Sequence, residues 1–168
     1  MILWLVGMMG SGKTTVGQLI ATASGVEFRD TDADVEGRSG MTIADLWAEG
    51  GEELFRSVEA DAVVDLARLD SAVIATGGGA VTDPTTRSVI SASGTVVWLR
   101  AQPAELVSRL SGQAGRPLLD ASDDLEATLR DLAIRRSGNY RSLADHTVDV
   151  DGRAPEDLAA EIEVLWKS

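Results

Sequence analysis

A glycine-rich segment near the start of the chain has the composition of a phosphate-binding loop. Gly7 to Thr14 read Gly-Met-Met-Gly-Ser-Gly-Lys-Thr, which fits the pattern G-x-x-x-x-G-K-[S/T]. Glycines let successive backbone N–H groups curl around a phosphate, and a helix that follows points its positive end at the same anion. We therefore expect Lys13 to reach the outer phosphates of a nucleotide and the Thr14 hydroxyl to ligate Mg²⁺.

Two aspartates lie just after the second predicted strand, in the segment Asp-Thr-Asp-Ala-Asp that begins at Asp30. Alternate residues of an extended segment share a side, so Asp30 and Asp32 are expected to face one site. One carboxylate would hold Mg²⁺ through water, and the other would accept a hydrogen bond from a substrate hydroxyl and draw off its proton. The alternative interpretation is a solvated acidic turn, which is common in a chain as acidic as this one.

A charged pair lies in a predicted helix. Arg56 and Glu59 are three residues apart and therefore share a helix face. As a surface ion pair they would contribute at most about 1 kcal/mol. Alternatively, Glu59 orients Arg56 toward an anionic substrate, and the residues alone leave both interpretations open.

Three consecutive glycines, Gly77, Gly78 and Gly79, follow the third predicted strand. Each glycine costs chain entropy on folding, so a plain turn would not require three. The run favours a close approach of the backbone to a ligand.

An arginine follows a stretch of small residues in the second half of the chain. Arg116 comes directly after Ser111–Gly115, which has the composition of a loop. A lid arginine that swings onto a transferring phosphoryl group is worth roughly 10³–10⁵ in rate. The alternative for any single arginine is a solvated charge.

The elements expected to position these residues alternate between short apolar strands and longer helical patterns. Strands are expected at Ile2–Val6, Val26–Arg29, Ala72–Ala75, Thr95–Leu99 and Thr147–Val150. A helix is expected along the apolar stripe from Val16 to Ala23, with a stop at Gly25. Further helices are expected over Thr42–Arg68 with a break at Gly50-Gly51, and over Pro103–Leu110, Leu125–Arg136 and Pro155–Trp166. This alternation predicts an α/β fold with a five-stranded parallel sheet between two layers of helices. Ligands of such sheets bind at the carboxyl ends of the strands, where the motifs above fall.

Length and composition limit the function classes further. The 168 residues suit one domain, and 15 basic against 27 acidic residues give a formal charge of −12. Such a surface repels nucleic acids and anionic membranes, so neither is expected as a partner. The absence of cysteine excludes disulfides and thiolate zinc sites and fits a cytoplasmic location. His146 is expected to be structural, and Trp4, Trp98 and Trp166 are expected in the core.

Taken together, the motifs resemble the shikimate kinase family over nearly the whole chain, from about Leu3 to Pro155. The resemblance rests on motifs in a fixed order: Gly7–Thr14, Asp30-Thr31-Asp32, Phe55-Arg56 with Glu59, Gly77-Gly78-Gly79-Ala80-Val81, Arg116-Pro117-Leu118-Leu119, and Arg136 through Tyr140 to Asp145. The phosphate-binding loop is shared by many families, whereas the whole set in this order is much more specific.

The resemblance implies an enzyme that transfers the γ-phosphoryl group of ATP to the 3-hydroxyl of shikimate. Residues of the substrate pocket would be Asp32, Arg56, Gly77, Gly78, Gly79 and Arg136, with Trp47 and Phe55 as walls. ATP would be held by Gly10, Ser11, Gly12, Lys13, Thr14 and Thr15, with Arg109 and Arg153 beside the adenine and with Lys13 and Arg116 on the transferring phosphoryl. Thr14 would ligate Mg²⁺, and Asp30 would reach it through water.

The resemblance also implies a three-layer α/β/α domain like that of the nucleoside monophosphate kinases, active as a monomer. A core of residues 1–32, 62–111 and 124–168 would carry a helical substrate-binding insertion at 33–61 and a lid at 112–123. Two departures from the family pattern are visible. Gly138 in Arg136-Ser137-Gly138-Asn139-Tyr140 is expected to loosen the turn that places Arg136, and Trp47 stands where Phe is usual.

Two alternatives remain open at this point. The first is another small-molecule kinase on the same fold, for gluconate, a cyclitol or a nucleoside monophosphate. The paired arginines favour a carboxylate on the substrate, and the triple glycine argues against gluconate. The second is a non-catalytic sensor of nucleotide or metabolite, against which the presence of Lys13, Asp30 and Asp32 argues.

Overall fold

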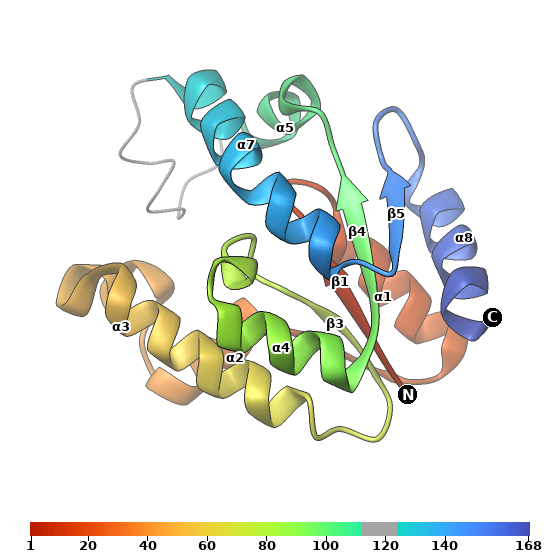
Figure 1. Ribbon diagram of the computed structural model, residues 1–168, viewed down its shortest axis with the longest axis horizontal. Helices are drawn as coiled ribbons and strands as arrows, with labels where there is room; N and C mark the ends of the chain where they lie inside the picture. The colour runs from red at the N-terminus through yellow and green to blue at the C-terminus, as the bar shows by residue number, and fades with distance from the viewer. Residues whose placement is uncertain (112–123) are drawn as a thin grey trace.

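The computed structural model describes residues 1–111 and 124–168 (Figure 1). Five parallel strands form one sheet in the order β2-β3-β1-β4-β5. The strands are β1 (Ile2–Val6), β2 (Glu27–Asp30), β3 (Ala72–Ala75), β4 (Gly94–Arg100) and β5 (His146–Asp149). The predicted parallel sheet is therefore confirmed, with each strand within about one residue of its expected bounds. The predicted lid at 112–123, with Arg116, lies outside the described residues.

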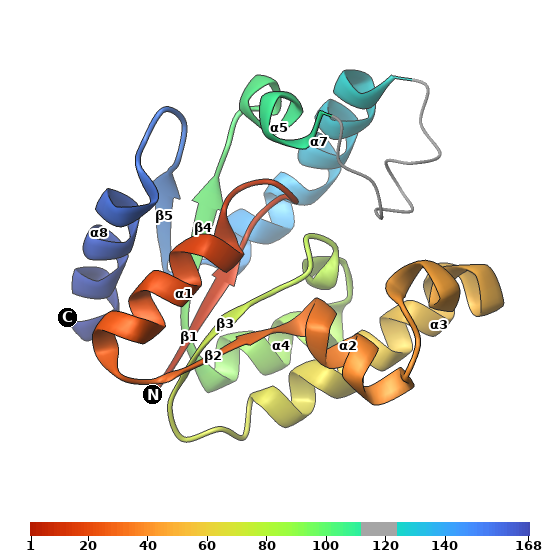
Figure 2. The same ribbon diagram turned by 180° about the vertical axis from the view of Figure 1, so that it is seen from behind.

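Helices cover both faces of this sheet, which confirms the three-layer architecture. The helices are α1 (Lys13–Ser24), α2 (Thr31–Ser39), α3 (Ile43–Leu66), α4 (Pro84–Ser93), α5 (Pro103–Leu110), α7 (Leu125–Leu143) and α8 (Pro155–Lys167), with a short 3₁₀ turn at Ala80–Thr82. Figure 2 shows α1 and α8 on one side of the sheet, and Figure 1 shows α3, α4 and α7 on the other.

Strand β1 lies at the centre of the sheet and explains why two cores form. Successive side chains of a strand point to opposite faces. Ile2, Trp4 and Val6 accordingly pack with residues of α3, α4, α5 and α7, while Leu3 and Leu5 pack with residues of α1 and α8. All five side chains are buried, as expected for a parallel strand covered on both faces.

Several helix signals in the sequence are confirmed. The Thr42 hydroxyl accepts a hydrogen bond from the Asp45 N–H at 3.1 Å and caps α3. Helix α3 is kinked at Gly51, where φ is 66°, so the predicted break is present although the helix resumes after it. Pro103 and Pro155 begin α5 and α8 as predicted.

Other helix predictions were wrong or incomplete. Helix α4 was missed because it is rich in Ser and Thr, which are weak helix formers. The signal that marks it is Asp83-Pro84, because Asp83 accepts a hydrogen bond from the Thr86 N–H at 2.7 Å. Helix α7 continues past its predicted end at Arg136 to Leu143, since Gly138 is tolerated in its interior.

The described helices include none that is long and apolar enough to cross a membrane. Trp4, Trp98 and Trp166 are all buried, which confirms their assignment to the core.

Candidate active site at the carboxyl ends of the strands

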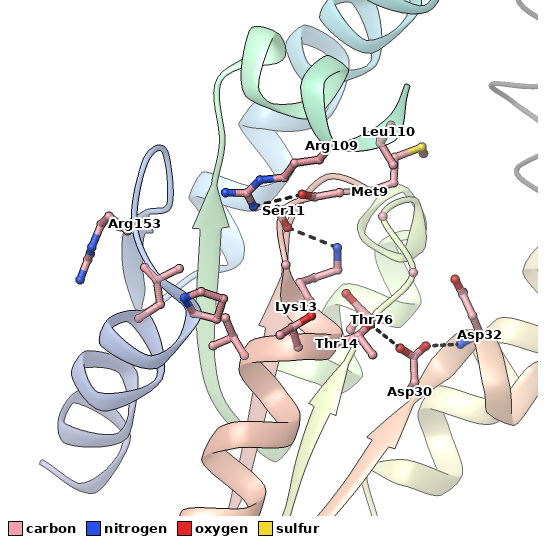
Figure 3. Close-up of a pocket in the computed structure, with 18 residues that line it drawn as sticks. Met9, Ser11, Lys13, Thr14, Asp30, Asp32, Thr76, Arg109, Leu110 and Arg153 are labelled. Carbon is pink, nitrogen blue, oxygen red and sulfur yellow. Dashed lines mark hydrogen bonds between the residues drawn. The ribbon is translucent and has the colours of Figure 1, made fainter. Parts of the chain in front are cut away.

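A cavity of about 500 Å³ opens at the carboxyl edge of the sheet (Figure 3). Its walls come from the glycine-rich loop, the ends of β2 and β3, helix α5 and the connection from β5 to α8. The residues that line it are Met9, Gly10, Ser11, Gly12, Lys13, Thr14, Thr15, Val16, Asp30, Asp32, Thr76, Gly77, Gly78, Arg109, Leu110, Arg153, Pro155 and Leu158. The sheet topology thus brings together most of the motifs that the sequence singled out.

The glycine-rich loop has the backbone conformation that its composition predicts. Gly7, Gly10 and Gly12 all have positive φ, at 146°, 81° and 93°. The ammonium group of Lys13 is buried and donates to the carbonyl oxygens of Gly7 at 2.9 Å and of Met8 at 2.8 Å. Lys13 therefore lies folded along the loop, within the cavity that the phosphates of a nucleotide would enter.

The predicted magnesium ligands are adjacent. The Thr14 hydroxyl donates to Asp30 Oδ2 at 2.9 Å, and Figure 3 shows Asp30 between Thr14 and the backbone of Asp32. Mg²⁺ in kinase sites takes one or two protein oxygens and completes its shell with waters and phosphates. These two oxygen groups beside the loop fit that ion. The described residues contain no cluster of three or more acidic or histidine side chains suited to a metal held by protein alone.

The local structure around Asp32 differs from the prediction. Asp30 ends β2 and caps α2, accepting a hydrogen bond from the Asp32 N–H at 3.0 Å, so Asp32 lies in the first turn of a helix. The extended segment predicted for 30–34 was therefore wrong, although both aspartates still line the same cavity. The physical reason is that an aspartate followed by two further acids favours the start of a helix, since the first turn attracts negative charge.

A group of charged side chains adjoins this cavity. Its burial decides between the two interpretations of Arg56, a surface ion pair and an arginine that Glu59 orients. Arg56 Nη1 donates to Glu59 Oε2 at 2.6 Å, and Glu59 is only 2% exposed, so the pair is no surface ion pair. Arg136 is also buried, at 4% exposure, and Glu59 lies within electrostatic range of it. Glu59 Oε1 and Arg136 Nη1 have no hydrogen-bond partner among the described residues, which is costly for buried polar atoms.

The pKa of Glu59 reflects its surroundings. Burial raises it above the ordinary 4.5, the guanidinium of Arg56 opposes that rise, and the neighbouring carboxylate of Asp32 adds to it. Two carboxylates and two guanidinium groups thus lie close together, with Glu59 and Arg136 buried and Asp32 and Arg56 partly buried, and their formal charges cancel. We call Asp32, Arg56, Glu59 and Arg136 the acceptor cup.

The three glycines explain how the cup is built. A Cβ on Gly79 would overlap Arg56 Nη2 and lie 2.6 Å from Arg56 Cζ, and one on Gly77 would lie 2.6 Å from Glu59 Oε1 and 2.7 Å from Asp32 Oδ1. None of the three glycines has a positive φ, so space rather than backbone conformation requires them. The run was expected to let a ligand approach the backbone, and that approach stays a prediction. The groups that lie close to Gly77 and Gly79 in the structure are charged side chains of the protein itself.

The predicted aromatic walls lie together on α3. The rings of Trp47 and Phe55 are 6.0 Å apart, and the Arg56 guanidinium lies 5.0 Å from the centre of the Phe55 ring. Phe55 belongs to a small separate core with Val35, Leu46 and Ala62 that joins α2 to α3.

The arginines expected beside the adenine line the opposite part of the cavity. Arg109 on α5 donates to the carbonyl oxygen of Gly10 at 3.3 Å and pairs with Glu105 at 2.7 Å. Arg153 pairs with Glu161 at 2.6 Å and lies across the phosphate-binding loop from Asp32 (Figure 3).

Two buried residues contribute to the site in ways that the sequence does not predict. The Thr31 hydroxyl accepts a hydrogen bond from the Gly77 N–H at 2.7 Å, and the Tyr140 hydroxyl donates to the Gly78 carbonyl at 2.5 Å. Each residue belongs to one of the longer motifs, but its own role was missed because a long-range contact to a backbone atom leaves no periodic signal in a sequence.

Comparison with known proteins agrees with this arrangement. The family model described as shikimate kinase matches residues 9–165. The chain belongs to the shikimate kinase family. It is 45% identical over 161 residues to a shikimate kinase of Salinispora arenicola, covering 96% of this chain and 95% of that protein. It is 46% identical over 160 residues to one of Symbiobacterium thermophilum, with 94% and 91% covered.

Solved structures of family members have the same fold. The shikimate kinase of Acinetobacter baumannii in complex with shikimate superposes with a TM-score of 0.95 at 37% identity, covering 98% of this chain and 91% of the other. The shikimate kinase of Bacteroides thetaiotaomicron gives a TM-score of 0.89 at 28% identity, with 99% and 98% covered. Membership of this family identifies the protein as an ATP-dependent kinase and confirms the resemblance found in the sequence.

Proposed function

We propose that this protein transfers the γ-phosphoryl group of ATP to the 3-hydroxyl of shikimate. The observation that carries the proposal is the acceptor cup, in which Arg56 and Arg136 converge on the buried carboxylate of Glu59 beside a phosphate-binding loop. The solved relative from Acinetobacter baumannii, which is named as a shikimate complex, supports the choice of acceptor.

The two arginines supply recognition of the substrate carboxylate. A guanidinium group donates in a planar fork that matches a carboxylate, and Arg136 Nη1 is a buried donor without a partner among the described residues. Glu59 holds Arg56 at 2.6 Å and so keeps it from turning into solvent. A carboxylate on the acceptor would accept a hydrogen bond from the unpartnered Arg136 Nη1, and that charge-assisted bond would be stronger than one to the hydroxyl of a neutral polyol.

Asp32 supplies proton transfer at the other side of the acceptor. In the proposed step, the 3-hydroxyl oxygen of shikimate attacks the γ-phosphorus while the bond to the oxygen that bridges to the β-phosphate breaks. Asp32 takes the hydroxyl proton, and its position in the cup, next to Asp30 and on the wall of the main cavity, suits that role. Phosphoryl transfer otherwise requires mainly alignment and charge stabilisation.

Lys13 and the backbone of the glycine-rich loop would bind the phosphates. Mg²⁺, when bound with ATP, would neutralise the negative charge of the phosphates, and Thr14 and Asp30 are the residues suited to hold it. The contribution expected from Arg116 to the transferring phosphoryl remains a prediction, as do the boundaries of the substrate-binding insertion and the monomeric state.

The direct test is incubation of the purified protein with ATP, Mg²⁺ and shikimate, followed by mass-spectrometric detection of phosphoshikimate. A panel containing gluconate, a cyclitol and nucleoside monophosphates separates the other acceptors on this fold. We expect shikimate to be the acceptor in this panel that is phosphorylated, and the others to give no product. Turnover with another acceptor, or binding of ATP and shikimate without product, would overturn the proposal in favour of a different kinase or a sensor.

A further inference from the structure

The peptide bond between Gly78 and Gly79 lies at the meeting point of the phosphate-binding loop and the acceptor cup. Gly77 and Gly78 line the main cavity, and a Cβ on Gly78 would lie 3.0 Å from the Met9 N and 3.6 Å from Arg136 Nη1. The Ala80 N–H donates to the Gly77 carbonyl at 3.1 Å, which makes Gly78 and Gly79 the central residues of a tight turn.

The backbone conformation of the two glycines does not by itself fix the orientation of this peptide. A peptide unit that has glycine on both sides meets no Cβ barrier when it rotates, because glycine populates both signs of φ. Rotation would exchange the positions of the Gly78 carbonyl and the Gly79 N–H, which point in opposite directions across a trans peptide. Among the hydrogen bonds of the described residues, none is donated by the N–H of Gly78 or of Gly79. The Gly79 N–H is therefore available to a ligand in only one orientation of this peptide, the one that its rotation decides.

Tyr140 sets that orientation. Its hydroxyl donates to the Gly78 carbonyl at 2.5 Å, and its ring is only 1% exposed and stacks on Trp98 with 5.5 Å between centroids. Tyr140 is also one helical turn beyond Arg136 on α7, so the two side chains share a helix face. Burial raises the pKa of the phenol, and the nearby guanidinium of Arg136 only partly opposes this, so the hydroxyl remains a donor at neutral pH.

We propose that Tyr140 is a positioning residue that holds the Gly78–Gly79 peptide in register with Arg136, so that the acceptor binds to a preformed cup. Tyr140 does not touch the acceptor in this proposal. It acts through the Gly78 carbonyl and through the helix that it shares with Arg136. The inference rests on the proposed function, because the ligand whose binding it supports is shikimate.

The test compares Tyr140→Phe with Trp98→Phe in coupled ADP assays and in calorimetric titrations with shikimate. The Tyr140→Phe variant removes one hydroxyl and retains a ring on Trp98, so it is expected to fold. We expect its Kd and KM for shikimate to rise about 3- to 10-fold, as for loss of one hydrogen bond, with KM for ATP within about twofold of the wild type. Trp98→Phe weakens the same packing and leaves the hydroxyl in place, so it should lower Tm without changing KM for shikimate.

The outcomes separate this inference from the proposed function. If the wild type phosphorylates shikimate and Tyr140→Phe lowers Tm with both KM values unchanged, the tyrosine is merely structural and the inference is wrong. Equal rises in the two KM values would also overturn it, because general loosening affects both substrates. If the wild type fails to phosphorylate shikimate at all, the proposed function itself fails.

Discussion

Arg56 occupies the space in which a side chain at position 79 would lie, with its Cζ only 2.6 Å from the place that a Cβ on Gly79 would take. The guanidinium is held there by Glu59, whose carboxylate is buried. The absence of side chains in the triple-glycine turn therefore leaves the space that the charged groups of the acceptor cup occupy.

Gly79→Ala should weaken acceptor binding and also lower stability. Loss of the ion pair to the buried carboxylate of Glu59 is costly, and the new methyl group breaks that pair by displacing Arg56. Its displacement from the cup should raise KM for shikimate by about 10-fold or more, because small misplacements of positioning groups are costly. Steady-state kinetics with each substrate varied will check this, and an unchanged KM for shikimate would contradict the assigned role of Arg56.

Gly138→Ala should raise stability and leave acceptor binding unchanged. Gly138 lies in the interior of α7 with negative φ, and apart from its own helix backbone no atom lies within 4 Å of the place that a Cβ would take. Alanine there should stabilise the protein by roughly 0.5–1 kcal/mol, which corresponds to a rise in Tm of about 1–4 °C in calorimetry. Both KM values should stay constant, because Arg136 is already fixed by burial. A changed KM for shikimate would show instead that flexibility at Gly138 governs Arg136.

The raised pKa of Glu59 predicts a pH effect on acceptor binding. As the pH falls, Glu59 protonates above the ordinary 4.5 and releases its charge-assisted hold on Arg56. The kcat/KM for shikimate should therefore begin to fall at a pH above that value. At pH 7 the kcat/KM of Glu59→Gln for shikimate should be about 10-fold lower than that of the wild type, and it should not show the fall that protonation of Glu59 causes. The measurement is kcat/KM for shikimate as a function of pH for both proteins. If the two profiles fall in the same way at low pH, protonation of Glu59 is not responsible for the fall.

The same pKa shift has a defined sign for stability. A carboxyl whose pKa is higher in the folded state contributes fully to stability below its unfolded pKa and loses that contribution as the pH rises through the folded value. Unfolding in denaturant at several pH values should thus show Glu59→Gln gaining stability relative to the wild type as the pH rises above the ordinary 4.5.

Asp32→Asn should abolish most turnover while the fold survives. Removal of a general base costs about 10²–10⁴ in rate, whereas the cap of α2 is supplied by Asp30 and stays intact. Asp34→Asn is the matched control, since Asp34 lies on the same helix, pairs with Arg29 and does not line the cavity. Coupled ADP assays and circular dichroism should show a large loss of kcat for the first variant only. Near-normal kcat for Asp32→Asn would exclude it as the proton acceptor.

The sequence by itself determined the sheet, the phosphate-binding loop and the family. Alternating apolar segments and glycines at set spacings are local signals, and local backbone physics is sufficient to turn them into strands and into a loop that can surround a phosphate. Helix α4 and the end of α7 lack a clear apolar repeat and were missed, because packing against the sheet stabilises them.

Only the tertiary structure decided what the charged residues do. Arg56 with Glu59 could equally have been a solvated pair, and burial made it part of a cup with Arg136, which lies on a different helix far along the chain. The glycines at 77–79 and the hydroxyl of Tyr140 acquired their roles in the same way, through contacts between segments that are distant in sequence. Desolvation depends on all the neighbours that surround a group in space, and a linear pattern of residues does not contain that information.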